Sequence, residues 1–194
     1  MPRPATTSAE AILDAVTRLA GENGPAAASI QAISAATGAS VGSLYHRFAS
    51  REALLAQAWL RAADVFLSTF ILTLNGCGTV EDGVQAALVT PRWARENRYA
   101  AALILSQNRN DFLSAGVPAG TLQEAGALAH GLNTALQGFV GRVGITDLSG
   151  LARCRYALIG IADGAVRLYL PGRAPPMDLD SWVEAAYRGV MTPR

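Results

Sequence analysis

The chain has 194 residues, which is enough for one substantial core, or for a small head and a body, and excludes two full-sized domains. Hydrophobic residues make up 51% of it and charged residues only 16%, so we expect a partner subunit to cover surplus apolar surface. Its net charge of +1 excludes a protein that is basic throughout, and any nucleic-acid binding must come from a local surface.

The two cysteines and the N-terminal segment exclude several further classes. Cys77 and Cys154 have no nearby partner cysteines, so neither a CxxC redox motif nor a zinc cluster can form in sequence, and reduced structural thiols are expected. Residues 1–10 lack the apolar core of a signal peptide, and the apolar stretch 157–170 is interrupted by an acid and a base. We therefore expect a cytoplasmic protein without a cofactor or metal, neither exported nor membrane-spanning.

Helical periodicity dominates the sequence, and the predicted fold is all-α with about nine helices. Thr7 and Glu10 have the spacing of a capping box at the start of the first helix. Ile12, Val16 and Leu19 then mark one apolar face, and the helix is expected to end at the glycines of residues 21–24.

Three more helices are predicted between residues 29 and 70. Ser29 can cap a short second helix that ends at Gly38, and a third short helix follows over residues 40–46. Ser50 can cap a fourth helix, in which apolar residues recur at helical spacing as far as Phe70.

The remaining chain predicts a helical body. After a break at residues 75–78, residues 79–82 are expected to restart a helix, which Pro91 either kinks or ends. Long helices are expected over residues 118–143 and about 147–170, and a final helix from about residue 178 or 180.

The stretch 29–55 carries the functional signal. Its two short helices cannot bury much alone, so Ile30, Ile33, Val41, Leu44 and Phe48 are expected to pack on the first helix. The polar face of the third helix then stays free, with short hydroxyl donors near its N-terminus. Such a face suits the major groove, where phosphate oxygens and base edges accept hydrogen bonds.

The run GASVGSLYHRF at residues 38–48, followed by SREALL at 50–55, resembles the DNA-binding domain of the tetracycline-repressor (TetR) family. The resemblance covers about residues 9–56. It implies an N-terminal three-helix helix-turn-helix domain at residues 1–50 and a C-terminal helical effector-binding and dimerisation domain at residues 51–194. It also implies a transcriptional regulator that binds operator DNA as a homodimer.

The resemblance further implies which residues meet DNA. Positions near the DNA backbone or at the entry, groove-facing end and flank of the recognition helix correspond to Ser29, Gln31, Ser40, Val41, Gly42, Ser43, Tyr45, His46 and Arg51. Arg51 stands where the family usually has lysine. Residues 1–61 hold five arginines against four acids, so operator affinity is expected to be modest and strongly salt dependent.

A different interpretation of the same residues is an enzyme. Residues 38–42 match GxSxG, the nucleophile elbow of α/β-hydrolases, with His130 as the candidate base. That elbow needs a preceding strand, whereas residues 31–36 have a helical pattern, so the hydrolase is the less favoured alternative.

The body contains candidate ligand-binding residues, because small-molecule pockets are apolar with few polar groups. Core packing is the alternative explanation for each aromatic among them. The candidates are Trp59, Phe66, Trp93, Tyr99, Asn108, Phe112, His130 and Gln137.

The segment 151–170 combines large apolar residues with Gly160 and Gly164, and such interior glycines weaken a helix unless a close contact compensates. The resemblance implies that the last two long helices pair with those of a second copy as a four-helix bundle, whereas packing within one chain is the alternative. Asp163 and Arg167 lie four residues apart, which is the spacing of a surface ion pair.

The favoured hypothesis is a repressor that a small apolar ligand releases from a near-palindromic operator by tilting the fourth helix. A TetR-like DNA binder without a small-molecule effector is the second hypothesis, and a helical enzyme is the third.

Overall fold

The structure is a computed structural model that describes residues 7–113 and 116–192, and every regular element in these ranges is helical. When α5 is joined to α6, α7 to η2, and α9 to η4 and α10, nine helices result besides two short 3-10 turns. The all-α prediction is thus confirmed. The elements are α1 (Ala9–Asn23), η1 (Pro25–Ala27), α2 (Ile30–Thr37), α3 (Val41–Arg47), α4 (Arg51–Gly76), α5 (Gly83–Ala87), α6 (Val89–Glu96), α7 (Arg98–Ala101), η2 (Ala102–Ser106), η3 (Arg109–Asp111), α8 (Ala119–Arg142), α9 (Gly150–Arg155), η4 (Tyr156–Gly160), α10 (Ile161–Arg167) and α11 (Leu179–Met191).

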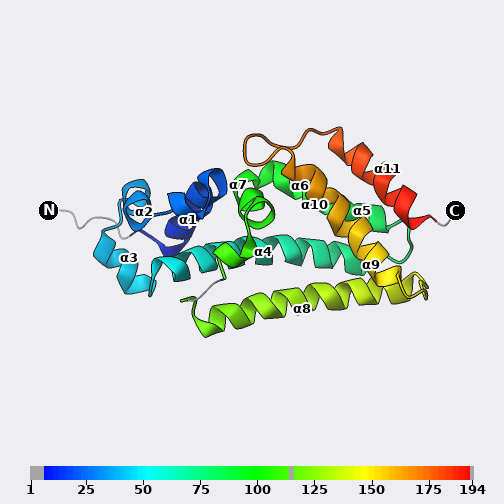
Figure 1. The fold of residues 1–194 in the computed structure, drawn as a ribbon, viewed down its shortest axis with the longest axis horizontal. Helices are drawn as coiled ribbons and strands as arrows, with labels where there is room; N and C mark the ends of the chain where they lie inside the picture. The colour runs from blue at the N-terminus through cyan, green and yellow to red at the C-terminus, as the bar shows by residue number, and fades with distance from the viewer. Residues whose placement is uncertain (1–6, 114–115, 193–194) are drawn as a thin grey trace.

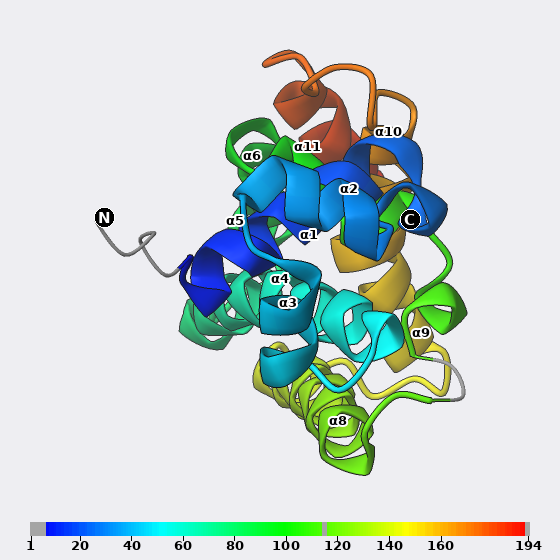
Figure 2. The same cartoon turned by 90° about the vertical axis from the view of Figure 1, so that its left-hand side faces the viewer.

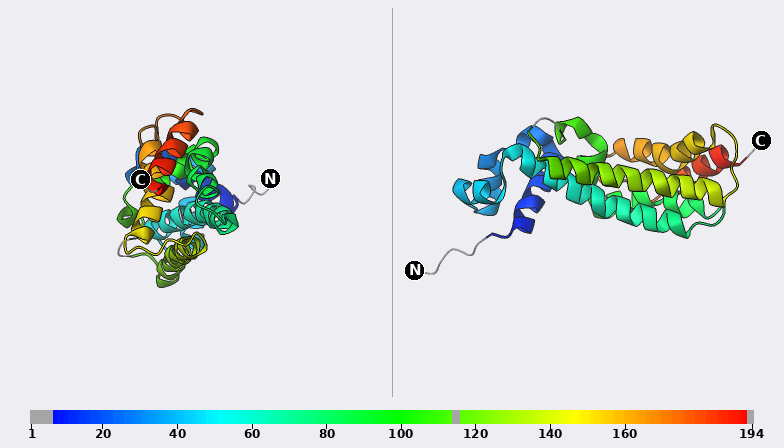
Figure 3. Two further views of the ribbon diagram at one scale, coloured as in Figure 1. Left: turned by 90° about the vertical axis from the view of Figure 1, so that its right-hand side faces the viewer. Right: turned by 90° about the horizontal axis from the view of Figure 1, so that it is seen from below.

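The molecule is elongated, with a small head of α1, α2 and α3 at one end and the C-terminus at the other (Figure 1). Helix α4 starts beneath the head and runs the length of the body. Helix α8 lies alongside α4 in both the front view and the view from below (Figure 3). The segment from α9 to α10 returns toward the head, and α11 packs on the outer side of the body.

The start of α1 differs from the sequence prediction. Its N-cap is Ser8, whose hydroxyl accepts a hydrogen bond from the backbone N–H of Ala11 at 3.1 Å. Thr7 instead donates its hydroxyl to the carbonyl of Thr37 at 3.2 Å. The correction follows from the tertiary structure, because the end of α2 lies within reach of Thr7 and occupies its side chain.

Helix α4 begins as expected, with Ser50 accepting from the backbone N–H of Ala53 at 3.0 Å. It continues past Phe70 to Gly76, because Leu74 still finds a buried site. It is the one helix of the described residues that could cross a membrane by length and composition, and half of that apolar stretch is buried inside the protein. This burial is typical of a core helix.

Residues 79–82 form a turn and not the predicted helix start, which is a second correction. The carboxylate of Asp82 accepts from the backbone N–H groups of Gly78 and Thr79, which holds the chain in the turn. The break at Leu88 between α5 and α6 follows from Pro91. Proline cannot donate to the carbonyl four residues earlier, and its ring crowds that carbonyl.

Helix α8 and the segment from α9 to α10 agree with prediction within a few residues. The second of them starts at Gly150 and not at residue 147, because the carboxylate of Asp147 accepts from the N–H of Ser149 in the preceding turn. It contains a π-helical turn, η4, and ends at Arg167.

Two clusters of buried side chains form the core, and α4 belongs to both. The first cluster joins α1, α2 and α3 to the N-terminal half of α4, and also includes Leu103, Phe112 and Ala125 of the body. The second joins the C-terminal half of α4 to α5, α6, α8, α10 and α11. The expected domain boundary after residue 50 coincides with the start of a helix that stabilises both sides.

The head also contacts the body through a close approach of α1 to α7. A Cβ atom on Gly21 would overlap the backbone carbonyl of Tyr99. Glycine is therefore required here by space alone, and the two backbones hold the head against the body.

We predict that Gly21→Ala lowers the free energy of unfolding by about 1–3 kcal/mol, because either backbone must move to admit the methyl group. Urea unfolding followed by circular dichroism measures this change. Gly189→Ala on α11 is the matched control, since nothing lies within 4 Å of a Cβ there. Its stability should be unchanged or higher by up to about 1 kcal/mol. Equal stability of Gly21→Ala and the wild type would contradict the prediction.

Candidate DNA-binding surface and ligand cavity

The helix-turn-helix of the head is built by hydroxyl groups at fixed positions. Ser29 accepts from the backbone N–H of Ala32 at 3.1 Å and caps α2, and Ser40 accepts from that of Ser43 at 3.1 Å and caps α3. Gly38 between the two helices has φ +70°, in the left-handed region that favours glycine. The cap at Ser29 and the turn at Gly38 follow the sequence prediction, whereas Ser40, predicted as the first residue of the third helix, is its N-cap.

Two further hydroxyls brace the turn between α2 and α3. Ser34 donates to the carbonyl of Ala39 at 2.7 Å, and Thr37 both donates to the carbonyl of Ile33 and accepts from the N–H of Ala39. Because these bonds fix the path from α2 into α3, they also fix the direction in which α3 presents its outer face.

Helix α3 has one buried side and one free side. Leu44 is fully buried against the head core, whereas Tyr45 is 51% exposed. Val41 is 42% exposed, which corrects its expected packing on the first helix, since Ile30, Ile33, Leu44 and Phe48 already fill that core. Figure 2 shows α2 and α3 at the end of the molecule, with nothing in front of them.

The other predicted DNA-contacting residues lie on or beside this free side. Ser40, Gly42, His46 and Gln31 are exposed, and Ser43 is partly buried. A Cβ on Gly42 would have nothing within 4 Å, so the backbone of α3 is open to close approach at its first turn. The exposed face therefore offers hydroxyl, imidazole, amide and backbone donors in one place.

Arg51 has an intramolecular role that the sequence does not reveal. Its Nε donates to the carbonyl of Ala28 at 3.0 Å, and its Nη2 donates to that of Pro25. Its Nη1 lies 3.7 Å from the carboxylate of Glu52. The guanidinium braces the segment before α2 against the start of α4, and a phosphate would have to share it.

GxSxG does not form a nucleophile elbow in this structure. The residues before Ser40 belong to helix α2, and the described ranges contain no strand from which such an elbow could start. Ser40 uses its oxygen as a helix cap, and His130 lies exposed on α8 in the body. The geometry that the hydrolase interpretation needs is absent from the described residues.

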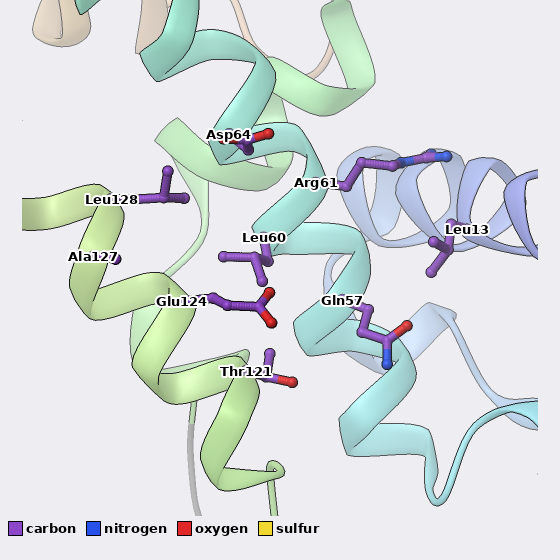
Figure 4. Close-up of a pocket in the computed structure, with 9 residues that line it drawn as sticks. All are labelled: Leu13, Gln57, Leu60, Arg61, Asp64, Thr121, Glu124, Ala127 and Leu128. Atoms are coloured by element: carbon purple, nitrogen blue, oxygen red, sulfur yellow. The ribbon is translucent and has the colours of Figure 1, made fainter. Parts of the chain in front are cut away.

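Arg61 connects α4 to the head. Its two terminal nitrogens contact Glu10 at 2.6 Å and Asp14 at 2.5 Å, both on α1. Figure 4 shows this side chain pointing from α4 toward α1, while Leu60 and Glu124 point into the space between α4 and α8. That space is an open groove of about 610 Å³ whose walls also include Gln57 and Asp64.

A second, smaller cavity of about 170 Å³ lies in the body and is partly open to solvent. Its walls come from α4, η2, α8, η4 and α10, and most of the side chains are aliphatic or aromatic. Phe66 contacts two other aromatic rings in tilted arrangements, with its ring centre 6.3 Å from that of Phe70, which also lines the cavity, and 5.1 Å from that of Trp93, which does not. The lining residues are Trp59, Ala63, Phe66, Leu67, Phe70, Ile104, Leu105, Leu132, Ile159 and Asp163.

Asp163 is the one charged residue in this lining. Its Oδ1 is buried and makes no hydrogen bond of ordinary geometry among the described residues, although the Thr90 hydroxyl lies close enough to lower the pKa of the carboxyl, and no ion pair joins it to Arg167. The expected surface pair is thus wrong, because the helix directs the carboxylate inward. Burial raises the pKa of Asp163 to about 6, against the smaller lowering effects of Arg167 and the Thr90 hydroxyl.

The structure brings together only part of the predicted ligand set. Trp59 and Phe66 line the cavity, and Trp93 packs behind Phe66. Tyr99 borders a surface groove beside α1, and Phe112 is buried in the cluster shared with the head.

The three polar candidates lie away from the cavity. Asn108 caps the exposed turn η3, accepting from the N–H of Asn110 at 3.0 Å, and His130 and Gln137 are exposed on α8. The polar group that does reach the cavity is Asp163, for which the sequence spacing predicts a surface ion pair. The sequence signal for its position in the cavity is a single acid within an apolar helix.

We predict that Asp163→Asn raises the free energy of unfolding at pH 7.5 by up to about 3 kcal/mol. In the unfolded chain this carboxyl is charged above about pH 4, whereas in the folded protein its pKa of about 6 means that the charged form is unfavourable. The wild-type protein therefore becomes less stable as the pH rises from about 4 to about 6, and the variant does not. The advantage of the variant should therefore shrink at pH 4.5, as urea unfolding at the two pH values can measure.

Asp147→Asn is the control of opposite sign. Hydrogen bonds from Ser149 and then Arg153 hold the pKa of Asp147 below its usual value, so losing its charge should lower stability at neutral pH. A less stable Asp163→Asn variant at pH 7.5 would contradict the assignment of Asp163 as an unpaired buried acid.

The comparisons with known proteins agree with this architecture. Residues 12–58 match the family described as bacterial regulatory proteins, tetR family. No curated protein matches the chain. Solved structures match over nearly the whole length, at identities that establish the fold alone.

Three of these structures illustrate the match. FadR of Bacillus subtilis, in complex with stearoyl-CoA, is 15% identical, with a TM-score of 0.70 over 95% of this chain and 98% of its own. A putative tetR family regulator from Shewanella is 20% identical, with a TM-score of 0.69 over 96% and 98%. PfmR of Thermus thermophilus is 20% identical, with a TM-score of 0.67 over 98% and 100%.

A helix-turn-helix head joined to an all-helical body is the architecture that this chain shares with these solved structures. Residues 12–58 belong to the tetR family of bacterial regulatory proteins, and the whole chain has the fold of TetR-family regulators. The family resemblance in the sequence is confirmed.

Proposed function

We propose that the protein is a homodimeric transcriptional repressor of the cytoplasm, which binds a near-palindromic operator and is released from it by a small apolar ligand. The observation that carries this proposal is the free face of α3, a capped helix with exposed Tyr45 and His46 at the end of the molecule. Its head belongs to a family of regulatory proteins. We also propose the domain division after residue 50.

The chemistry of the α3 face supports contact with DNA. Ser40 keeps its hydroxyl proton free while its oxygen caps the helix, and Gly42 lets the backbone approach a phosphate. Tyr45 and His46 follow one turn later and reach the groove. Ser29, Gln31, Val41, Ser43 and Arg51 complete the proposed contact set.

We predict that Tyr45→Ala weakens binding to the DNA flanking the gene by about tenfold, since lost contacts of this kind cost roughly 1–3 kcal/mol. Fluorescence anisotropy at two salt concentrations measures the loss. Tyr45→Phe separates the hydroxyl from the ring. Trp182→Ala removes an exposed aromatic of α11 and should leave binding unchanged. Wild-type protein that shows no preference for this DNA over unrelated DNA would refute the proposal.

The second face that supports the proposal lies on α8 and on the segment from α9 to α10. Tyr156, Gly160, Gly164 and Leu168 are exposed along one side of that segment, and Gly164 has nothing of its own chain within 4 Å of a Cβ. An exposed strip with large apolar ends and small central residues suits close packing of a partner helix. The exposed polar face of α8, with His130 and Gln137, lies beside it, and Arg155 donates to Asn133 across the two helices.

We predict that Gly164→Arg converts the dimer to a monomer, because the free chain has room for the side chain and a packed dimer does not. Light scattering after size-exclusion chromatography measures the mass. Gly189→Arg on α11, where a Cβ is equally free, should remain dimeric. A dimeric Gly164→Arg protein would place the interface elsewhere.

The route from ligand to DNA in this proposal is α4. It lines the cavity with Trp59, Phe66 and Phe70, and Arg61 ties it to α1 of the head. A ligand that enlarges the cavity would tilt α4 and change the spacing of the two recognition helices from about 34–36 Å. Moving a 1:99 balance of the two forms to 99:1 requires a difference in binding of roughly 5.5 kcal/mol.

The cavity size limits which ligand the proposal accepts. FadR of Bacillus subtilis was solved with stearoyl-CoA. The cavity of this chain, at about 170 Å³, lies below the roughly 300–1,000 Å³ of sites for drug-sized ligands. We therefore propose a compact effector and not a long acyl thioester.

A further inference from the structure

Three polar side-chain atoms in or beside the body cavity have no hydrogen-bond partner among the described residues. They are Nε1 of Trp59, Oγ1 of Thr90 and Oδ1 of Asp163, and all three are buried. Folded proteins pair nearly all such atoms. The Thr90 hydroxyl lies close enough to the Asp163 carboxyl to lower its pKa, so these two groups interact, and the carboxylate still lacks a cationic partner among the described residues. Trp59 and Asp163 both line the cavity, from α4 and α10 respectively.

The charge balance of the cavity selects the kind of group that can pair with Asp163. The lining contains this one carboxylate and no basic side chain. A carboxylate that is shielded from water attracts a cation strongly and repels an anion. Trp59, Phe66 and Phe70 also line the cavity, and aromatic rings attract cations through their π-electrons, as the guanidinium of Arg109 shows at 5.6 Å from the centre of the Trp59 ring. Both features favour a positively charged ligand group.

The size and the remaining surface define the rest of the ligand. A cavity of about 170 Å³ is close to the roughly 150 Å³ of an apolar cavity that admits benzene. Beyond Asp163 the walls are apolar, with Ile104, Leu105, Leu132 and Ile159 completing them. One ring with a short arm therefore fills the space, and a second polar group has few places to go besides Trp59 and Thr90.

We propose that the effector is a compact apolar amine, whose protonated nitrogen pairs with Asp163 and whose ring packs among Trp59, Phe66 and Phe70. The assignment of this molecule as an effector rests on the proposed function, whereas its chemistry rests on the cavity. An ion pair with the amine offsets the cost of burying the carboxylate, so binding favours the form of the body whose enlarged cavity holds the ligand.

The open groove between α4 and α8 is a weaker site for the same ligand. It also has carboxylates, Asp64 and Glu124, but both are exposed to water, which screens their attraction for a cation (Figure 4). Arg61 adds a positive charge at its edge. Asp64 therefore serves as the control position, because it lies on α4, as Trp59 does, but lines the open groove and not the body cavity.

Isothermal titration calorimetry on the 194-residue protein at pH 7.5 tests the proposal with three ligands of one shape. 2-Phenylethylamine is the cation, 2-phenylethanol the neutral molecule and phenylacetate the anion. We expect the amine to bind at least about tenfold more tightly than the alcohol, since an ionised hydrogen bond is the stronger one, and phenylacetate not to bind measurably. In Asp163→Asn the amine should fall to the affinity of the alcohol, while Asp64→Asn should keep the wild-type preference.

Several outcomes would overturn the proposal. One is equal binding of amine and alcohol by the wild type, and another is tighter binding of phenylacetate. Loss of amine binding in Asp64→Asn but not in Asp163→Asn would assign the ligand to the open groove. Failure of all three probes to bind at millimolar concentration would exclude compact amines. Circular dichroism of each variant confirms that it is folded.

DNA binding without ligand separates this proposal from the proposed function. If the protein binds its flanking DNA and ignores the amine, only the ligand assignment fails. If it binds the amine but no DNA, the regulator role fails and the cavity chemistry stands. Release of bound DNA by the amine, and not by the alcohol at equal concentration, would support both.

Discussion

The structure depends on the shared burial of α4. This single helix supplies apolar side chains to the core of the head with its first half and to the core of the body with its second half. Both clusters include buried side chains of α4, and α4 is one continuous helix that joins them. A rigid element common to two cores couples them mechanically, because a shift at one end has to be accommodated by packing at the other.

The contacts around α4 explain how the head is held. Arg61 contacts two acids of α1, and Arg51 donates to two carbonyls before α2, so each arginine anchors a different part of the head to the same helix. Arg47 in turn donates to the carbonyl of Thr7. Three of the five arginines in residues 1–61 thus make hydrogen bonds or ion pairs within the chain. The exposed polar side chains of α3 are those of Tyr45 and His46, and such groups position a helix on DNA through hydrogen bonds.

Asp163 gives the body a feature that stability alone would not select. An unpaired carboxylate in an apolar cavity destabilises the fold, and a neutral residue of the same shape would avoid the penalty. Costs of this kind concentrate at functional sites, where a ligand can supply the missing partner. The aromatic side chains beside it contact one another, with Phe66 against both Phe70 and Trp93. The cavity thus combines apolar walls with one carboxylate that has no ion-pair partner among the described residues.

The sequence by itself determined the local elements and the nature of the head. Ser29 and Ser50 each cap the helix predicted for them, and Gly38 makes the turn, because caps and turns depend on bonds between residues a few positions apart. Family resemblance over residues 12–58 rests on the same short-range pattern.

Only the tertiary structure decided which side chains meet across the fold. Thr7 donates a hydrogen bond to the end of α2, and Arg51 donates to the segment before α2. Asp163 lines the cavity, whereas His130 and Gln137 lie exposed on α8. Helical periodicity places a residue on a face of its helix but does not say which neighbour covers that face. That choice is made by the packing of helices far apart in the chain, where small rotations exchange a surface position for a buried one.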